Sequence, residues 1–183
     1  MPELPEPTPA PALGHAEPVA PLACCGLRHA LLLAGVLLGL GFLFAMVEIQ
    51  IEGPAGWAAK LPTWRIENHP LLNWFWGGKP LTGYHLWVFL FMAAVFHLPL
   101  ALVGTFSLKL EARIIGSVMV FWILEDFLWF ILNPAYGLAR FRPDSVPWHK
   151  QWVLGIPTDY LVFFVAGCLL IGVSFRRAKA QTP

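Results

Sequence analysis

Two adjacent carboxylates interrupt an apolar run in the stretch Phe121-Trp122-Ile123-Leu124-Glu125-Asp126-Phe127-Leu128-Trp129-Phe130-Ile131-Leu132. On membrane-insertion scales an acid near the middle of a span costs about 2.5 to 3.5 kcal/mol, whereas each Leu, Ile, Phe or Val returns roughly 0.3 to 0.6 kcal/mol. The run 114–132 therefore needs partner helices or a ligand to stay in a membrane. Because a close acidic pair resists double ionisation, we expect at least one of the two carboxyls to hold a proton or to face a cation.

The composition around this stretch is typical of an integral membrane protein. Of the 183 residues, 57% are hydrophobic, 14% are aromatic and only 13% are charged, and the mean hydropathy is +0.64. Four apolar runs are candidate membrane helices, at residues 27–49, 84–103, 114–132 and 160–175. Since backbone in lipid must satisfy its own hydrogen bonds, the sequence predicts an all-α four-helix bundle with Trp-rich loops at the membrane interface.

The chain divides into three parts on this basis. Residues 1–26 form a tail rich in Pro and Ala, which is expected to be disordered because it cannot bury enough apolar surface. Residues 27–176 form the four-span domain, and residues 177–183 form a basic tail. The first run is predicted to be a retained span and not a cleaved signal peptide. The cysteines Cys24, Cys25 and Cys168 form neither a zinc-binding pattern nor an even disulfide framework.

The distribution of charged residues predicts a membrane topology, and it does not indicate a soluble partner. The formal net charge is +1, so nucleic acid is not an expected partner, whereas the lipid bilayer is. Lys and Arg divide evenly between the two membrane sides, but those on the side of the termini lie in short segments close to the spans, where the positive-inside bias acts. We therefore expect both termini in the cytoplasm, and a location in a bacterial inner membrane.

With this topology, titratable residues of every span gather at the pole opposite the termini. Glu48 ends the first run, His85 opens the second, the Glu125-Asp126 pair lies in the far half of the third, and Asp159 opens the fourth. His149 stands in a compact segment, Pro147-Trp148-His149-Lys150, that caps the same side. Trp122 and Trp129 stand about one helical turn either side of the acids and could wall a shared site.

The sequence predicts a metal site at this pole. The candidate ligands are Glu125, Asp126, His85, His149 and Glu48. Carboxylate and imidazole donors suit iron, zinc, manganese or copper, and helical bundles build such sites from Glu and His on several helices. Glu125 and Asp126 would be the catalytic residues of a membrane-embedded oxidoreductase or hydrolase, with Trp122 and Trp129 against the cofactor. Asp159 or His97 would have an orienting or relay role.

Two other functions remain open from the sequence. A proton-coupled transporter, working as a homodimer, would load and release a proton at Glu125 or Asp126. An accessory or assembly subunit of a larger membrane complex would instead pair these acids with a partner's Lys or Arg. The purely structural explanation for the pair is a salt bridge to Arg140 or Arg142 within the chain.

Overall fold

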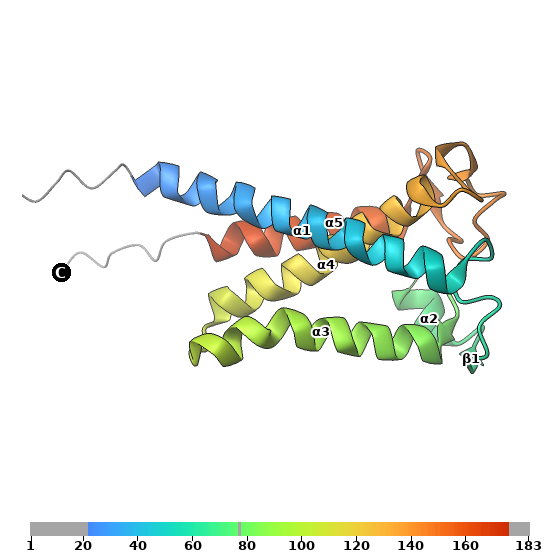
Figure 1. Cartoon of the computed structure of the whole chain (residues 1–183), viewed down its shortest axis with the longest axis horizontal. Helices are drawn as coiled ribbons and strands as arrows, with labels where there is room; N and C mark the ends of the chain where they lie inside the picture. The colour runs from blue at the N-terminus through green and yellow to red at the C-terminus, as the bar shows by residue number, and fades with distance from the viewer. Residues whose placement is uncertain (1–21, 77, 176–183) are drawn as a thin grey trace, which may run out of the picture.

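The structure is a computed structural model, and it describes residues 22–76 and 78–175. Long helices run side by side, and short elements close one end of them (Figure 1). The long helices are α1 (Leu22–Glu52), α3 (Gly83–Val103), α4 (Leu108–Leu132) and α5 (Thr158–Ser174). The cap between α1 and α3 contains β1 (Arg65–Ile66), α2 (Pro70–Phe75) and β2 (Leu81–Thr82). The cap between α4 and α5 contains the 3₁₀ helix η1 (Leu138–Arg140), β3 (Trp152–Val153) and β4 (Ile156–Pro157).

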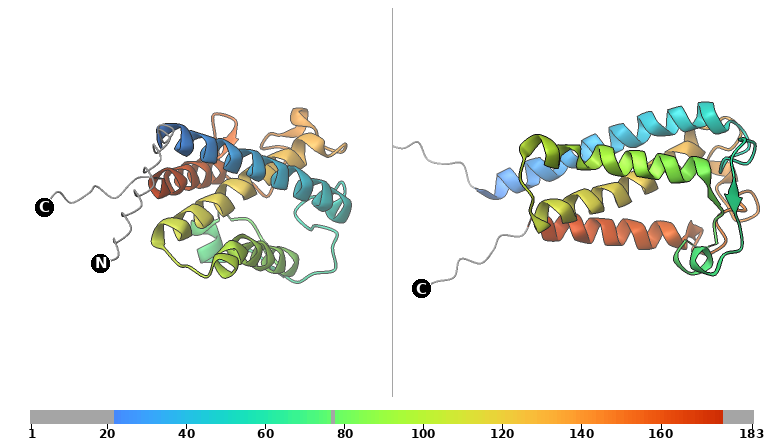
Figure 2. Two further views of the ribbon diagram at one scale, coloured as in Figure 1. Left: turned by 60° about the vertical axis from the view of Figure 1, so that its left-hand side comes forward. Right: turned by 90° about the horizontal axis from the view of Figure 1, so that it is seen from below.

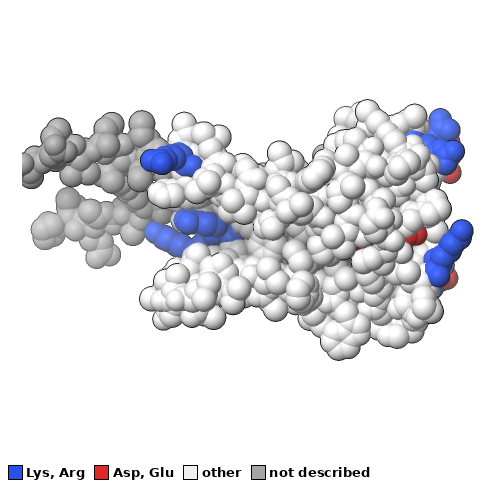
Figure 3. All heavy atoms as spheres, viewed as in Figure 1, with Lys and Arg blue, Asp and Glu red and all other residues white. Residues whose placement is uncertain are grey.

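Each predicted apolar run lies in one of the four long helices. Three of these are long and apolar enough to cross a membrane, at Gly26–Glu52, Gly83–Val103 and Leu108–Leu132. The helix α5 is also apolar but has only 17 residues. Many large apolar side chains on these helices are exposed, as expected for surfaces that contact lipid; examples are Leu43, Trp87, Leu102 and Leu169. In the view of Figure 3, the visible Lys and Arg side chains lie at the two ends of the molecule, and the surface between these ends shows none.

Two predicted segments fall partly or wholly outside the described residues. Residues 1–21 of the predicted tail and the whole basic segment 177–183 are not described. Helix α1 begins at Leu22, before the predicted start of the first span at Leu27. Helix α1 also extends beyond the other end of the predicted run, because it continues past Ile49 up to Glu52.

Helix α4 is the centre of the packing, with α1 against one side and α5 against another. The crossing with α5 is close because glycines meet there: a Cβ added to Gly116 would lie 2.6 Å from the carbonyl oxygen of Gly167. On α1, a Cβ at Gly41 would lie 3.4 Å from the amide nitrogen of Glu125. Gly35 and Gly39 have no neighbour within 4 Å. Small residues therefore permit both close approaches to α4.

Helix α3 joins this group mainly through aromatic side chains. The ring centroids of Phe89 and Trp122 are 4.7 Å apart in an edge-on contact, and those of Phe96 and Phe121 are 5.3 Å apart. Helices α3 and α5 each pack against α4 and have little backbone contact with each other. The right-hand view of Figure 2 accordingly shows α4 between them. A space lined by side chains of all three helices therefore remains at the capped end.

Local signals in the sequence fix where the helices start and stop. The hydroxyl of Thr82 accepts a hydrogen bond from the backbone N–H of His85, and that of Ser107 accepts one from Leu110. Gly104 ends α3 with φ +68°, a conformation that glycine adopts without steric cost. These caps place His85 in the first turn of α3, at the same end of the molecule as the Glu125-Asp126 pair.

Candidate active site at the capped end

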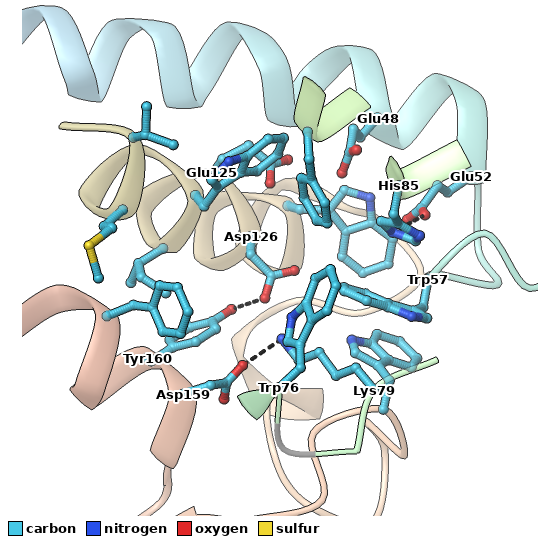
Figure 4. Close-up of a pocket in the computed structure, with 18 residues that line it drawn as sticks. Glu48, Glu52, Trp57, Trp76, Lys79, His85, Glu125, Asp126, Asp159 and Tyr160 are labelled. Carbon is cyan, nitrogen blue, oxygen red and sulfur yellow. Dashed lines mark hydrogen bonds and ion pairs between the residues drawn. The ribbon is translucent and has the colours of Figure 1, made fainter. Parts of the chain in front are cut away.

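A cavity of about 230 Å³ lies at the capped end, between α1, α3, α4 and α5 (Figure 4). Five acidic side chains line it: Glu48, Glu52, Glu125, Asp126 and Asp159. His85, Trp122 and Trp129 also line it, so six of the seven predicted site residues meet at one place. The seventh, His149, reaches this group through its hydrogen bond to Asp126.

The two acids of α1 face the cavity from one side of that helix. Glu48 and Glu52 are four residues apart, which places both on the same face. Glu48 accepts a hydrogen bond from the hydroxyl of Tyr84 at 3.0 Å, and Glu52 accepts one from the backbone N–H of Ala58 at 2.5 Å. Both glutamates are buried, with exposed fractions of 7% and 8%. The bond from Tyr84 ties α3 to α1 beside the cavity.

Glu125 is the most deeply buried of the acids. Its exposed fraction is 2%, and its Oε1 atom has no hydrogen-bond partner among the described residues. Glu125 and Glu48 both line the cavity, and Figure 4 shows their carboxyl groups pointing into the same space. A hydrogen bond between two carboxyl groups needs a proton on one of them. The sequence predicts that at least one acid of the Glu125-Asp126 pair holds a proton or faces a cation, and Glu48 on α1 is the carboxyl group with which Glu125 would share such a proton.

Asp126 belongs to a different network. Its Oδ2 accepts a hydrogen bond from the hydroxyl of Tyr160 at 2.5 Å and lies 3.1 Å from Nε2 of His149. The other ring nitrogen of His149, Nδ1, lies 3.2 Å from Oδ1 of Asp159. Asp159 in turn pairs with the buried ammonium of Lys79 at 2.6 Å. An Asp–His–Asp–Lys chain therefore runs from α4 through the loop to α5 and the cap.

Glu125 and Asp126 have different partners because side chains at consecutive helix positions point about 100° apart. Glu125 points toward α1, and Asp126 points toward α5 and the loop of His149. Arg140 donates to the carbonyl of Ala135 and Arg142 to the hydroxyl of Ser145, so the salt bridge considered as the structural explanation is not what the structure shows for either arginine. The cation in the network of Asp126 is Lys79.

His85 lies in a separate part of the site from the network of Asp126 and His149. Its ring stacks on Trp57 with centroids 4.0 Å apart, and its Nδ1 is 2.6 Å from the hydroxyl of Thr82. Its Nε2 faces Glu52 at 3.7 Å. His149 is thus hydrogen-bonded to two carboxylates, Asp126 and Asp159, whereas His85 is held by Thr82 and by stacking on Trp57.

The described residues do not form a ready metal site. Within residues 22–76 and 78–175 no group of three or more His, Cys, Asp and Glu is arranged to hold a metal ion. Metal binding by Glu125, Asp126, His85, His149 and Glu48 stays a prediction. It would require His149 to leave one of its two carboxylates, or His85 to turn from Glu52 and Thr82.

Indole rings make up much of the wall. Besides the predicted Trp122 and Trp129, the cavity is lined by Trp57, Trp76 and Trp148. The Nε1 donor of Trp129 is buried and has no hydrogen-bond partner in the described part of the chain. One acceptor, Glu125 Oε1, and one donor, Trp129 Nε1, are thus both unpaired beside the same cavity. A buried polar group without a partner is costly, so both atoms are suited to bind a ligand.

Besides these three indoles, four titratable residues described above were not among the predicted site residues. Glu52 could have been found, because it repeats Glu48 one helical turn later. Tyr160 follows Asp159 and could have been placed at the head of the same helix. Tyr84 is the first residue of the second predicted run, and Lys79 carries no local signal because the fold of the cap brings it inward. Conversely, His97 lies at the other pole, where its Nε2 is 3.1 Å from Glu111, so the structure does not place it in a relay here.

No protein-family model, curated protein or solved structure matches this chain.

Proposed function

We propose that this protein is a small membrane-embedded enzyme that binds a ligand in the capped-end cavity and exchanges a proton with it. The observation that carries the proposal is the unpaired Oε1 atom of Glu125, buried in a cavity between Glu48 and the Asp126–His149 pair. An unpaired carboxyl oxygen inside a cavity is placed to contact whatever enters it. In this account Glu125 is the residue that touches the ligand.

The two carboxyl systems support a division of roles. We assign the proton donor to Glu125 together with Glu48, because both are buried and their carboxyl groups point into the same space. Asp126 receives donors from Tyr160 and His149, an arrangement that favours the ionised carboxylate. Neighbouring acids in contrasting environments are the usual arrangement for one general acid and one general base. The proposed reaction class is therefore proton transfer to one atom of a ligand and proton removal from another.

In the proposed membrane topology, α5 is a fourth span beside the three longer helices. The apolar α5 packs along α4, and its C-terminal end lies at the same pole as the start of α1 (Figure 1). Lys109 and Arg113 follow the short turn at that pole. We place this pole in the cytoplasm of a bacterial cell and the cavity near the outer face of its inner membrane.

Deuterium exchange into lipids tests the proposed chemistry. Purified wild-type protein, incubated with a bacterial membrane lipid extract in heavy water, is expected to place carbon-bound deuterium in a lipid species or to convert that species, as read by mass spectrometry. Glu125→Gln and Asp126→Asn should each abolish the change. Glu111→Gln is the matched control, because Glu111 pairs with His97 at the other pole. Spectra identical for the wild type and a protein-free sample would count against the proposal.

The predicted metal-dependent oxidoreductase or hydrolase uses the same residues, and metal analysis of protein purified in mild detergent separates it from metal-free proton transfer. Stoichiometric iron, zinc, manganese or copper that is lost in both Glu125→Gln and Asp126→Asn would favour the metal enzyme.

The transporter predicts a pH-linked flux in proteoliposomes that the same two substitutions abolish. The accessory role predicts a larger protein that co-purifies in stoichiometric amount.

A further inference from the structure

The cavity has a polar end and an apolar end. The acids, His85 and Lys79 line the end under the cap, whereas Val118, Met119 and Phe163 line the other end. Val118 precedes Glu125 by about two turns on α4, roughly 10 Å along the helix axis and close to the middle of that helix. The cavity is therefore amphipathic along the direction of the membrane normal, with its apolar end deeper in the bilayer.

The apolar end lies where the helices leave a lateral path. Phe89 of α3, Met119 of α4 and Phe163 of α5 all line the cavity. Helices α3 and α5 each pack against α4 and have little backbone contact with each other, so the lining residues of α4 at this end lie between the two helices. The neighbouring residues Leu90 and Val162 are 53% and 63% exposed, on surfaces that would contact acyl chains.

The volume indicates how much of a ligand the cavity can enclose. At about 230 Å³ it is smaller than the roughly 300 to 1,000 Å³ of pockets that bury a drug-sized molecule. A head group and the first part of a chain fit, and a longer molecule must continue outward. The apolar end between α3 and α5 is the exit that suits a hydrocarbon tail.

The polar end is suited to a positive charge. Five acidic side chains line the cavity, against Lys79 and His85 as basic ones, and Lys79 is already paired with Asp159. Even with one proton shared between Glu48 and Glu125, negative charge is in excess. The lining also holds indole faces, and the ammonium of Lys79 lies 4.9 Å from the ring centroid of Trp57. An ammonium group over an indole is the geometry of a cation–π contact.

We infer that the ligand of this site is a single-chain amphiphile with a positively charged amine or quaternary ammonium head, which enters from the bilayer between α3 and α5. The head lies among Glu125, Asp126 and the indoles, and the tail runs past Met119 into the lipid. This inference rests on the proposed function in that it assigns a substrate class to the same cavity.

Binding to protein in lipid nanodiscs tests the charge of the head, with the native tryptophan fluorescence of the cavity as the readout. The probes are dodecyltrimethylammonium, dodecanol and dodecanoate, which share a tail, and tetramethylammonium, which lacks it. The wild type should bind dodecyltrimethylammonium most tightly of the four. Glu125→Gln should weaken that binding about tenfold, because an amide cannot carry the part of the negative charge that Glu125 holds with Glu48, and should leave dodecanol unchanged. Equal affinity for dodecyltrimethylammonium and dodecanoate would overturn the cationic head.

A second pair of variants tests the lateral path. Met119→Phe fills the apolar end of the cavity and should weaken dodecyltrimethylammonium about tenfold while leaving the weak binding of tetramethylammonium unchanged. Val162→Phe is the matched control, because Val162 is exposed on α5 and does not line the cavity. Equal effects of the two substitutions would overturn the tail path. Helix content by circular dichroism and a monodisperse elution profile confirm that each variant is folded.

The deuterium-exchange experiment separates failure of this inference from failure of the proposed function. Tight, charge-dependent binding of dodecyltrimethylammonium without any exchange into lipids would leave the inference standing and remove the proton-transfer chemistry. Exchange into lipids without preference for the ammonium probe would do the reverse.

Discussion

At the scale of single residues, the site depends on two neighbouring acids that do different things. Glu125 is buried with an unpaired oxygen, and Asp126 is held by Tyr160 and His149. The sequence predicted that the run carrying these acids needs partner helices or a ligand, and that at least one of the two carboxyls would hold a proton or face a cation. It could not predict which partner belongs to which acid, since that depends on the direction of the α1 and α5 crossings.

The contrast predicts opposite effects of two conservative substitutions on stability. Asp126→Asn replaces the charged acceptor of two hydrogen bonds by a neutral amide oxygen, which weakens both bonds and should destabilise the fold by about 1–3 kcal/mol. Glu125→Gln removes a buried carboxyl from beside Glu48 and should leave the thermal midpoint in detergent unchanged or raise it. Glu125→Gln is thus expected to abolish the proposed activity without lowering the stability of the fold. A large fall in the midpoint of Glu125→Gln would show that the carboxyl is a structural group.

A metal-bound form has its own signature at this scale. If the five predicted ligands bind a metal, adding that metal should raise the thermal midpoint of the wild type, and this rise should vanish in a His149→Gln variant. Lys150→Gln, next to it in the loop and exposed, is the control. A midpoint that does not respond to iron, zinc, manganese or copper would contradict the metal prediction.

At the scale of elements, the crossing of α4 and α5 depends on glycine. A larger side chain at Gly116 has no room, because even a Cβ would lie 2.6 Å from the carbonyl oxygen of Gly167. Gly116→Leu should therefore separate the helices and destabilise the protein by about 1–3 kcal/mol or more. The measurement is the thermal midpoint in detergent. Gly35→Leu is the matched control, since nothing lies within 4 Å of its Cβ position, and similar losses for both would contradict the packing.

The apolar periodicity predicted where the helices are, but less of how they meet. Gly35, Gly39 and Gly41 together suggest a small-residue strip on α1, yet only Gly41 contacts α4. The loops were predicted to be aromatic caps at the interface. Their short strands and α2 could not be foreseen, because two-residue strands are too short to leave a pattern in the sequence. Lys79 reaches the site only through that folded cap.

At the scale of the whole molecule, the account predicts a topology. Helix α1 starts and α5 ends at one pole, and the cavity lies at the other (Figures 1 and 2). An alkaline phosphatase reporter, which is active only outside the cytoplasm, should be inactive when fused after Pro183 and active when inserted at Gly155, which is in the capped end. The reverse pattern would contradict the proposed orientation, and activity at both sites would contradict α5 as a span.

The central claim is that a proton is shared between Glu125 and Glu48 inside the cavity, and infrared spectroscopy tests it most directly. Purified wild-type protein at neutral pH should show the carbonyl stretching band of a protonated carboxyl group, and the band should shift on transfer to heavy water. It should be lost in Glu125→Gln and in Glu48→Gln, and kept in the control Glu111→Gln. A wild-type spectrum with no protonated carboxyl band, or a band that persists in Glu125→Gln, would contradict the account.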